Sequence, residues 1–200
     1  MTDRRSEILD GALRVLAEQG MRGLTHRAVD TAAGLSQGST SYYFRSRSAL
    51  VAGCVDRLLE LDLQIDAAAA PPPADPAELV EQLVAVGVSM TTGQRHRTLA
   101  RYELSLAAAR EPELRAALVR GGDAVRALVA RAVRSAANGA PAGARPAGPG
   151  DERVVAEELA ATLDGLVLTA LVRGPHEPAE LADRLRPALA RVLAAHLDHR

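Results

Sequence analysis

Apolar residues recur at helical spacing along nearly the whole chain, and this periodicity constrains the fold more than any other feature. In the segment 4–19, for example, the residues that share one helical face are Ile8, Leu9, Ala12, Leu13 and Leu16. Strand signals are nearly absent, because the chain holds one Phe, no Trp and no sustained alternation of β-branched residues. The chain is therefore predicted to be all-α.

Glycine and proline residues divide the helical pattern into about nine segments. The predicted helices cover residues 4–19, 26–33, 37–44, 47–69, 77–92, 94–110, 112–137, 152–173 and 179–198. Side-chain oxygens that can cap the first turn of four of these helices belong to Thr25, Ser36, Ser46 and Asp151. Residues 138–150, rich in Gly, Pro and Ala, are predicted to form a mobile loop without regular structure.

The composition excludes several classes of protein. Apolar residues make up 48% of the chain and charged residues 24%, which suits a folded domain. No apolar run approaches the length of a transmembrane helix, and the first residues lack the apolar stretch of a signal peptide, so no membrane association and a cytoplasmic location are expected. Cys54 is the single cysteine, so neither an internal disulfide nor a cysteine-based metal site is expected.

Residues 25–44 have the layout of a helix-turn-helix, in which two short helices flank a tight turn holding Gly34 and the inward-pointing Leu35. The second helix, residues 37–44, is almost free of large aliphatic side chains and rich in hydroxyl groups. Such a helix suits the major groove of DNA, where small polar and aromatic groups can reach base edges. Gly38 would let the backbone approach the duplex closely.

The side chains of this second helix have distinct expected roles. Gln37 could contact an adenine edge through two hydrogen bonds, and Ser39 and Thr40 could contact a base edge or a phosphate. The hydroxyls of Tyr42 and Tyr43 could reach phosphates, which position the helix without distinguishing sequences.

The charge distribution allows a small phosphate-binding surface, although the net charge of the chain is only −1. The charged residues of segment 22–57 that carry the local basic excess are Arg22, Arg27, Arg45, Arg47 and Arg57, against Asp30 and Asp56. The free amide hydrogens at the start of the fourth helix, beside Arg47, could bind a phosphate.

Three N-terminal segments carry a recognisable pattern. They read Gly-Leu-Thr-His-Arg-Ala-Val at 23–29, Ala-Ala-Gly-Leu-Ser-Gln-Gly-Ser at 32–39 and Tyr-Tyr-Phe-Arg-Ser-Arg-Ser-Ala-Leu at 42–50. This pattern resembles the signature of the TetR/AcrR family of transcriptional regulators. The resemblance implies a three-helix DNA-binding domain at residues 1–48 and a helical ligand-binding and dimerisation domain at residues 49–200. It also favours a repressor that binds palindromic operator DNA as a homodimer and is released by a small-molecule effector, with no cofactor.

The resemblance assigns roles to individual residues. The family's phosphate contact at the start of the second helix maps onto Thr25, His26 and Arg27. Its recognition-helix contacts map onto Gln37, Gly38, Ser39, Tyr42 and Tyr43, and its basic residue after the aromatic cluster maps onto Arg47. The family usually has a large apolar residue and then a tyrosine where this chain has Thr40 and Ser41. Thr40 therefore either weakens the packing of the recognition helix or faces the groove.

The last two predicted helices, 152–173 and 179–198, would form most of a four-helix dimer interface by the same resemblance. The apolar surface of the first is broader than one side of a monomer helix needs, although a helix central to a monomeric bundle would look similar. The candidate interface residues are Leu159, Leu163, Leu166, Val167, Ala170 and Leu189. A dimer would place two recognition helices about 34–36 Å apart, the spacing of successive major grooves.

Polar or adaptable side chains in otherwise apolar helices are the candidate ligand contacts. They are Gln64, Met90, Arg101, Tyr102, Arg126 and Thr162. An anionic ligand would be expected if Arg101 and Arg126 both pointed inward, but Arg101 could instead form a surface ion pair with Glu103 or Glu81. Aromatic residues are too few to cage a cation, so the hypothesis is a lipophilic or weakly polar metabolite.

The alternatives to DNA binding are an enzyme and a helical module that binds protein. An enzyme is disfavoured, because the histidines lack metal-ligand spacing with carboxylates or cysteine and the glycine-rich segment has neither a flanking strand nor a lysine. The remaining alternative is a helical interaction module that uses residues 25–44 to bind protein instead of DNA.

Overall fold

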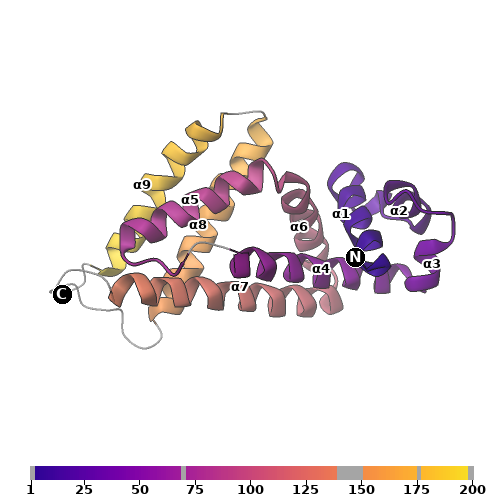
Figure 1. Ribbon diagram of the computed structural model, residues 1–200, viewed down its shortest axis with the longest axis horizontal. Helices are drawn as coiled ribbons and strands as arrows, with labels where there is room; N and C mark the ends of the chain where they lie inside the picture. Colours follow the sequence, from indigo (N-terminus) through magenta and orange to yellow (C-terminus); the bar gives the residue numbers. More distant parts are fainter. Residues whose placement is uncertain (1–2, 69–70, 139–150, 175–176, 198–200) are drawn as a thin grey trace. The chain divides into compact units, whose positions relative to one another are not determined.

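The structure is a computed structural model that describes residues 3–68, 71–138, 151–174 and 177–197. These residues form nine helices and no strand, which confirms the predicted all-α class. The helices are α1 (Arg4–Gly23), α2 (His26–Ala32), α3 (Ser39–Tyr43), α4 (Arg47–Ala68), α5 (Pro76–Thr91), α6 (Arg95–Ala108), α7 (Pro112–Asn138), α8 (Asp151–Arg173) and α9 (Pro178–Leu197) (Figure 1). Residues 139–150 of the predicted loop lie outside the described residues, and Asn138 belongs to α7.

Packing divides the chain into two units whose residues interleave along the sequence. Unit 1 contains residues 1–65 and 94–123, and unit 2 contains residues 66–93 and 124–200. The helix-turn-helix residues thus belong to the same unit as α6 and most of α4. The predicted domain boundary between residues 48 and 49 does not coincide with a boundary between the packed units. The division of functions at that boundary stays a prediction.

The core of unit 1 is built around α1, whose predicted apolar face is buried. Leu50, Cys54 and Leu58 of α4 and Ala100 and Leu104 of α6 belong to the same cluster of buried residues. A polar contact at its edge joins α4 to α1, because the largely buried Arg57 donates to both carboxylate oxygens of Asp10, at 2.9 and 3.1 Å.

Phe44, the only phenylalanine of the chain, is buried directly after α3. A Cβ atom at Gly53 of α4 would lie 2.8 Å from Phe44 Cε1 and 2.9 Å from Leu9 Cδ2. The absence of a side chain at Gly53 therefore makes the room that this ring occupies. The ring anchors the end of α3 in the core that α1 and α4 share.

The predicted caps are found at the starts of α2 and α4 but not at the start of α3. Thr25 Oγ1 accepts a hydrogen bond from the backbone N–H of Ala28, and Ser46 Oγ accepts one from Ala49, so both predicted caps are confirmed. The prediction that Ser36 caps the third helix is wrong. That helix begins only at Ser39, and the Ser36 hydroxyl is hydrogen-bonded to the Ser39 hydroxyl.

Unit 2 is organised by α5, α8 and α9, which pack against one another in pairs (Figure 1). Buried leucines recur at every fourth position of α9, namely Leu181, Leu185, Leu189 and Leu193. A Cβ atom at Gly87 of α5 would lie 2.6 Å from Leu185 Cδ1 and 3.0 Å from Leu163 Cδ1, so this glycine permits the close approach of the three helices. None of the helices described is both long and apolar enough to cross a membrane.

Candidate nucleic-acid interface

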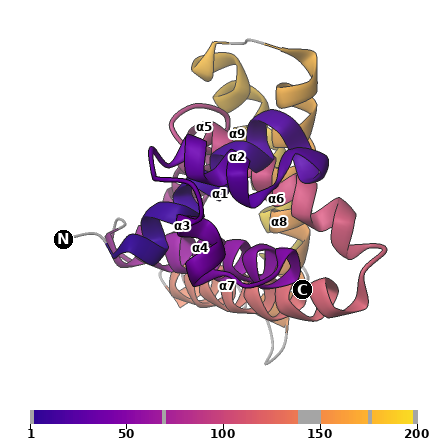
Figure 2. The ribbon, with the colours of Figure 1, turned by 90° about the vertical axis from the view of Figure 1, so that its right-hand side faces the viewer.

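The turn between α2 and α3 depends on two glycines with left-handed backbone conformations. Gly34 follows α2 with φ 68°, and Gly38 precedes α3 with φ 94°. Between them, the backbone N–H of Leu35 donates to the carbonyl oxygen of Asp30, and the Leu35 side chain packs against the core as predicted. The turn therefore has a defined geometry that presents α3 on the surface of unit 1 (Figure 2).

The outward surface of α3 and the preceding turn is polar and aromatic. Gln37, Gly38 and Ser41 are exposed, Tyr42 is 72% exposed and Tyr43 is 38% exposed. The two tyrosine rings meet edge to face, with 5.2 Å between their centroids. An exposed tyrosine pair of this kind has no role in the core, so its rings and hydroxyls are available to a partner.

Thr40 lies on the opposite side of α3 and is completely buried. Its hydroxyl donates to Asp30 Oδ1 at 2.5 Å, and its backbone N–H donates to the same oxygen at 2.7 Å. The prediction that Thr40 contacts DNA is therefore wrong, because the side chain has no surface and its hydroxyl proton is used inside the chain. Of the two alternatives for Thr40, packing beneath the helix is the one found.

Asp30 is the functional candidate that the sequence reasoning missed. It is 2% exposed, and its second oxygen, Oδ2, accepts a hydrogen bond from the backbone N–H of Gly38 at 2.8 Å. Burial alone would raise the pKa of this carboxyl group. The hydrogen bonds from the Thr40 hydroxyl and from the Thr40 and Gly38 amides, together with the nearby His26 ring, lower the pKa below its ordinary value of 3.8. Asp30 is thus held as a carboxylate.

His26, a predicted DNA contact, is engaged within the motif. Its Nε2 atom lies 2.8 Å from the carbonyl oxygen of Phe44, the residue that ends α3. A carbonyl oxygen can only accept, so Nε2 carries the proton. Only the other ring nitrogen, Nδ1, remains for a phosphate, and a DNA contact by His26 stays a prediction.

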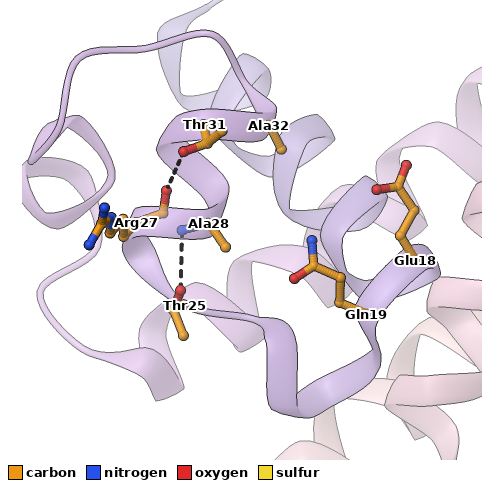
Figure 3. Close-up of a pocket in the computed structure, with 7 residues that line it drawn as sticks. All are labelled: Glu18, Gln19, Thr25, Arg27, Ala28, Thr31 and Ala32. Carbon is orange, nitrogen blue, oxygen red and sulfur yellow. Dashed lines mark hydrogen bonds between the residues drawn. The ribbon is translucent and has the colours of Figure 1, made fainter.

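An open depression between the end of α1 and the outer side of α2 lies next to two other predicted contacts. It is lined by Glu18, Gln19, Thr25, Arg27, Ala28, Thr31 and Ala32 (Figure 3). The hydroxyls of Thr25 and Thr31 both bond to the backbone of α2, at 3.1 Å. The exposed Arg27 guanidinium lies on the other side of the view from the Glu18 carboxylate, so any phosphate contact is expected on the Arg27 side.

Arg47, at the start of α4, is exposed but bonded to the last turn of α1, beyond the kink at Gly20. Its Nη2 atom donates to the carbonyl oxygen of Met21, whose own N–H donates to Glu103 of α6 at 3.2 Å. A guanidinium has five N–H donors, so this bond leaves others for a phosphate. The Ser46 hydroxyl also satisfies the Ala49 amide, which reduces the number of free amides in the predicted phosphate clamp.

The predicted dimer-interface residues lie mostly inside unit 2. Five of the six are buried within a single chain: Leu159, Leu163, Val167, Ala170 and Leu189. Leu166 is only partly buried. The assignment of the five buried residues to the interface is wrong, because a side chain already covered by α5, α8 and α9 of its own chain has no surface left for a second copy. Whether α8 is the central helix of a monomeric bundle or contributes another face to a dimer stays a prediction.

The six predicted ligand contacts are divided between the two units. Gln64, Arg101 and Tyr102 belong to unit 1, and Met90, Arg126 and Thr162 belong to unit 2. Gln64 is exposed and donates to Glu60 at 3.2 Å.

Arg101 and Glu81 form ion pairs that differ from the predicted pairing of Arg101 with Glu103 or Glu81. Arg101 donates through both Nη atoms to the carboxylate of Asp62, at 2.9 and 2.7 Å, and not to Glu81, which pairs with Arg186. A guanidinium paired with a carboxylate offers less charge to a ligand, which weakens the case for an anionic ligand. The ligand contacts themselves stay a prediction.

No group of three or more His, Cys, Asp and Glu side chains is placed to hold a metal ion among the described residues. Cys54 is buried, and burial raises the pKa of its thiol to about 12.

Comparisons with known proteins give a consistent result over most of the chain. Residues 8–54 match the family model described as bacterial regulatory proteins, tetR family, and residues 74–195 match the model of the tetracyclin repressor-like C-terminal domain. The HTH-type transcriptional regulator BetI of Rhizobium meliloti (strain 1021) is 31% identical over 167 residues, which are 82% of this chain and 76% of that protein.

Solved structures show the same relationship. A member of the TetR family from Streptomyces coelicolor A3 is 28% identical, with a TM-score of 0.64 over 94% of this chain and 98% of that one. The multidrug binding protein EbrR, in complex with ethidium, is 29% identical, with a TM-score of 0.63 over 93% of this chain and 98% of that one. The similarity thus extends over both the motif and the helices that follow it.

Proposed function

The chain belongs to the TetR family of bacterial regulatory proteins, and from this premise we propose that it is a repressor that binds a palindromic operator as a homodimer and is released by a small molecule. It is a DNA-binding transcriptional regulator by family, so the alternative of a helical module that binds only protein is no longer needed. We propose that it acts in the cytoplasm, where bacterial operator DNA lies.

The observation that carries the proposal is the contrast between the two sides of α3. Its outer side presents Ser41, Tyr42 and Tyr43, and the preceding turn presents Gln37, without a large aliphatic side chain, whereas the inner side of α3 is fixed by buried polar contacts. Side chains with donor and acceptor groups on a rigidly held helix are what base recognition in the major groove requires. The exposed Arg27 and Arg47 supply positive charge beside this surface for phosphates.

A gel-shift titration tests DNA binding directly. The DNA upstream of the gene for this chain should be retarded in preference to a scrambled duplex, and the affinity should fall steeply as salt rises. Arg27→Ala should weaken binding to both duplexes and reduce the slope of log affinity against log salt by about 1. Arg110→Ala, an exposed arginine outside the proposed interface, is the control and should leave the slope unchanged. Binding that is insensitive to salt and sequence would contradict the proposal.

Gln37→Ala separates base recognition from phosphate contact. If Gln37 contacts one base pair, its loss should cost about 1–3 kcal/mol at that position and leave other positions unaffected. Binding to operator variants substituted at single positions measures this. An equal loss of affinity on every duplex would reassign Gln37 to phosphate positioning.

The homodimer is proposed to use the outward face of α8, in place of the buried face predicted from the sequence. The exposed residues Val154, Ala161, Gly165, Leu168 and Val172 recur at helical spacing on this face. A Cβ atom at Gly165 would meet nothing within 4 Å in the single chain, so the backbone there is open to a close neighbour. An exposed apolar stripe of this length on one helix suits a symmetric contact with a second copy.

The effector is proposed to be a lipophilic or weakly polar molecule. The multidrug binding protein EbrR, to which this chain is similar, has structures in complex with ethidium and with malachite green. A thermal-shift screen should therefore include ethidium beside neutral lipophilic compounds. Stabilisation by neutral compounds, with loss of the gel shift in their presence, is the expected result, and stabilisation by cations alone would contradict this effector class.

A further inference from the structure

We infer that Asp30 is a positioning residue for DNA recognition, which sets the orientation of α3 through its buried carboxylate and its partner Thr40. This inference rests on the proposed function, because it concerns how α3 meets DNA. Asp30 itself does not contact DNA, since it is 2% exposed and lies beneath the helix that does.

The carboxylate of Asp30 holds the start of α3 through three hydrogen bonds. Oδ2 accepts from the backbone N–H of Gly38 at 2.8 Å, and Oδ1 accepts from both the N–H and the hydroxyl of Thr40, at 2.7 and 2.5 Å. Two of these donors are backbone amides at the start of the helix, one at the N-cap residue Gly38 and one in the first turn at Thr40, where amides have no partner within the helix. A side chain of α2 thus provides the cap that no residue beside α3 provides.

The shortness of α3 makes this contact necessary. A helix of five residues is too short to be stable alone, and Thr40 is its only buried residue. Its N-cap position is occupied by Gly38, which has no side chain and makes no capping bond. The outer side chains must remain polar to face DNA, so they cannot hold the helix in place by packing. The orientation of α3 therefore depends on the polar contacts beneath it.

The other end of α3 is also held by α2. His26 Nε2 donates to the carbonyl oxygen of Phe44, directly after the last residue of α3, and Phe44 is itself buried. His26 and Asp30 lie four residues apart on α2, so they are neighbours on one side of that helix. One side of α2 thus fixes both ends of α3, and a rotation or tilt of α3 would break at least one of the two contacts.

This arrangement predicts a particular effect on recognition. Base contacts require side chains to be placed within fractions of an ångström, whereas phosphate contacts by exposed arginines tolerate small shifts. If the Asp30 contacts are lost, the preference for the operator should fall more than the general attraction to DNA. Gln37 and Ser39, each adjacent to an amide that Asp30 would have held, should be affected first.

The experiment compares Asp30→Asn and Thr40→Val with wild type. A duplex selected from a randomised library by the wild-type protein and a scrambled duplex of equal composition serve as the two ligands. Both variants should lose about tenfold or more in the ratio of the two affinities, with an unchanged salt slope for the scrambled duplex. Thr40→Ser keeps the hydroxyl and should retain the ratio. Asp56→Asn, the same substitution at an exposed position of α4, should also retain it.

Amide hydrogen exchange gives a second measurement that does not require DNA. The N–H groups of Gly38 and Thr40 should exchange faster in Asp30→Asn than in wild type, while the amides of α1 should keep their rates. Loss of affinity for both duplexes in proportion, or equal behaviour of Thr40→Val and Thr40→Ser, would overturn the inference. If the wild-type protein showed no preference among duplexes, the proposed function itself would be overturned. This result would be seen before any variant is measured, so it is distinguishable from a failure of the inference about Asp30.

Discussion

A buried carboxylate is costly unless its oxygens receive hydrogen bonds, and Asp30 meets this condition with three donors. The position of Thr40 follows from the same requirement. A large apolar residue there would pack beneath α3 but would leave Asp30 without its hydroxyl donor. The two residues therefore depend on each other, and the departure at Thr40 from the pattern that this chain resembles has a physical reason.

The pH dependence of stability should reveal the ionised state of Asp30. Its pKa in the folded chain is lowered below 3.8, so its contribution to the free energy of unfolding is fully present above the unfolded value and is lost as pH falls through the folded value. Urea unfolding of wild type and Asp30→Asn at several pH values measures this. The stability difference between them should be largest near neutral pH and should shrink below about pH 4. A difference that is constant or grows in acid would contradict the assignment.

Cys54 is expected to be unreactive in the folded protein. The thiol is completely buried in the core of unit 1, and burial raises its pKa to about 12, so almost no thiolate is present at neutral pH. A thiol reagent such as Ellman's reagent should modify it quickly in guanidinium chloride and much more slowly in native buffer. Equal rates in the two conditions would show that this part of unit 1 opens readily.

Gly38 is expected to contribute to the stability of the fold, through its backbone conformation, as well as to the close approach of the backbone to DNA. Its φ of 94° is unfavourable for residues with a side chain, although a Cβ atom there would meet nothing within 4 Å. Gly38→Ala should lower the free energy of unfolding by about 1–2 kcal/mol, as measured by urea unfolding. Gly93→Ala is a matched control, because that position is equally open but has no positive φ. Equal effects of the two substitutions would contradict this explanation.

Among the helices, the sequence predicts local features well and long-range ones poorly. The starts of α2 and α4 could be predicted, because Thr25 and Ser46 lie next to the amides they cap. The start of α3 could not, because its cap, Asp30, lies eight and ten residues before the amides it accepts from and on another helix. Helical periodicity does not indicate such pairings.

The apolar face of α8 shows a second limit of prediction from sequence. Periodicity identified Leu159, Leu163 and Val167 as one apolar face, and they do share one. The pattern does not say whether that face is covered by α5 and α9 of the same chain or by a second copy, because both surfaces are equally apolar. The exposed Val154, Leu168 and Val172 also lie on α8, so its apolar residues are not confined to the buried face and their pattern alone does not mark which face is inside.

Close packing of α5 against α8 and α9 gives a prediction at the scale of elements. Gly87→Ala would place a Cβ atom 2.6 Å from Leu185 Cδ1, so it should destabilise the chain by about 1–3 kcal/mol through overpacking. Leu185→Val in the same chain should recover part of this loss by making room. Gly121→Ala, where the nearest atom outside its own turn is at 4.0 Å, should be neutral or stabilising and serves as the control. Thermal unfolding of these three variants and of wild type measures the effects.

For the whole molecule, we expect DNA binding and dimerisation to be carried out by different units of the chain, although its net charge of −1 gives no sign of such a division. The motif residues belong to unit 1, whereas α8, whose outward face is proposed to bring two copies together, belongs to unit 2. DNA binding by one copy engages one recognition helix, and occupation of two successive major grooves requires the second copy. The proposed dimer should therefore contribute to operator affinity without touching DNA.

Substitution of Leu168 tests this link between assembly and DNA binding. Leu168 is an exposed apolar residue of the outward α8 face. Leu168→Arg would place a charge from each copy in the proposed symmetric contact between the two α8 helices. Light scattering after size-exclusion chromatography should show a monomer at concentrations at which wild type is a dimer. Operator affinity should then fall to the level that wild type shows for a duplex with a single half-site, because the second recognition helix is no longer held nearby. Leu106→Arg, at a position of α6 that is more exposed than Leu168 (62% against 45%), should leave both the mass and the affinity unchanged. A monomeric wild type, or a Leu168→Arg dimer with full operator affinity, would show that this face of α8 does not join the two copies.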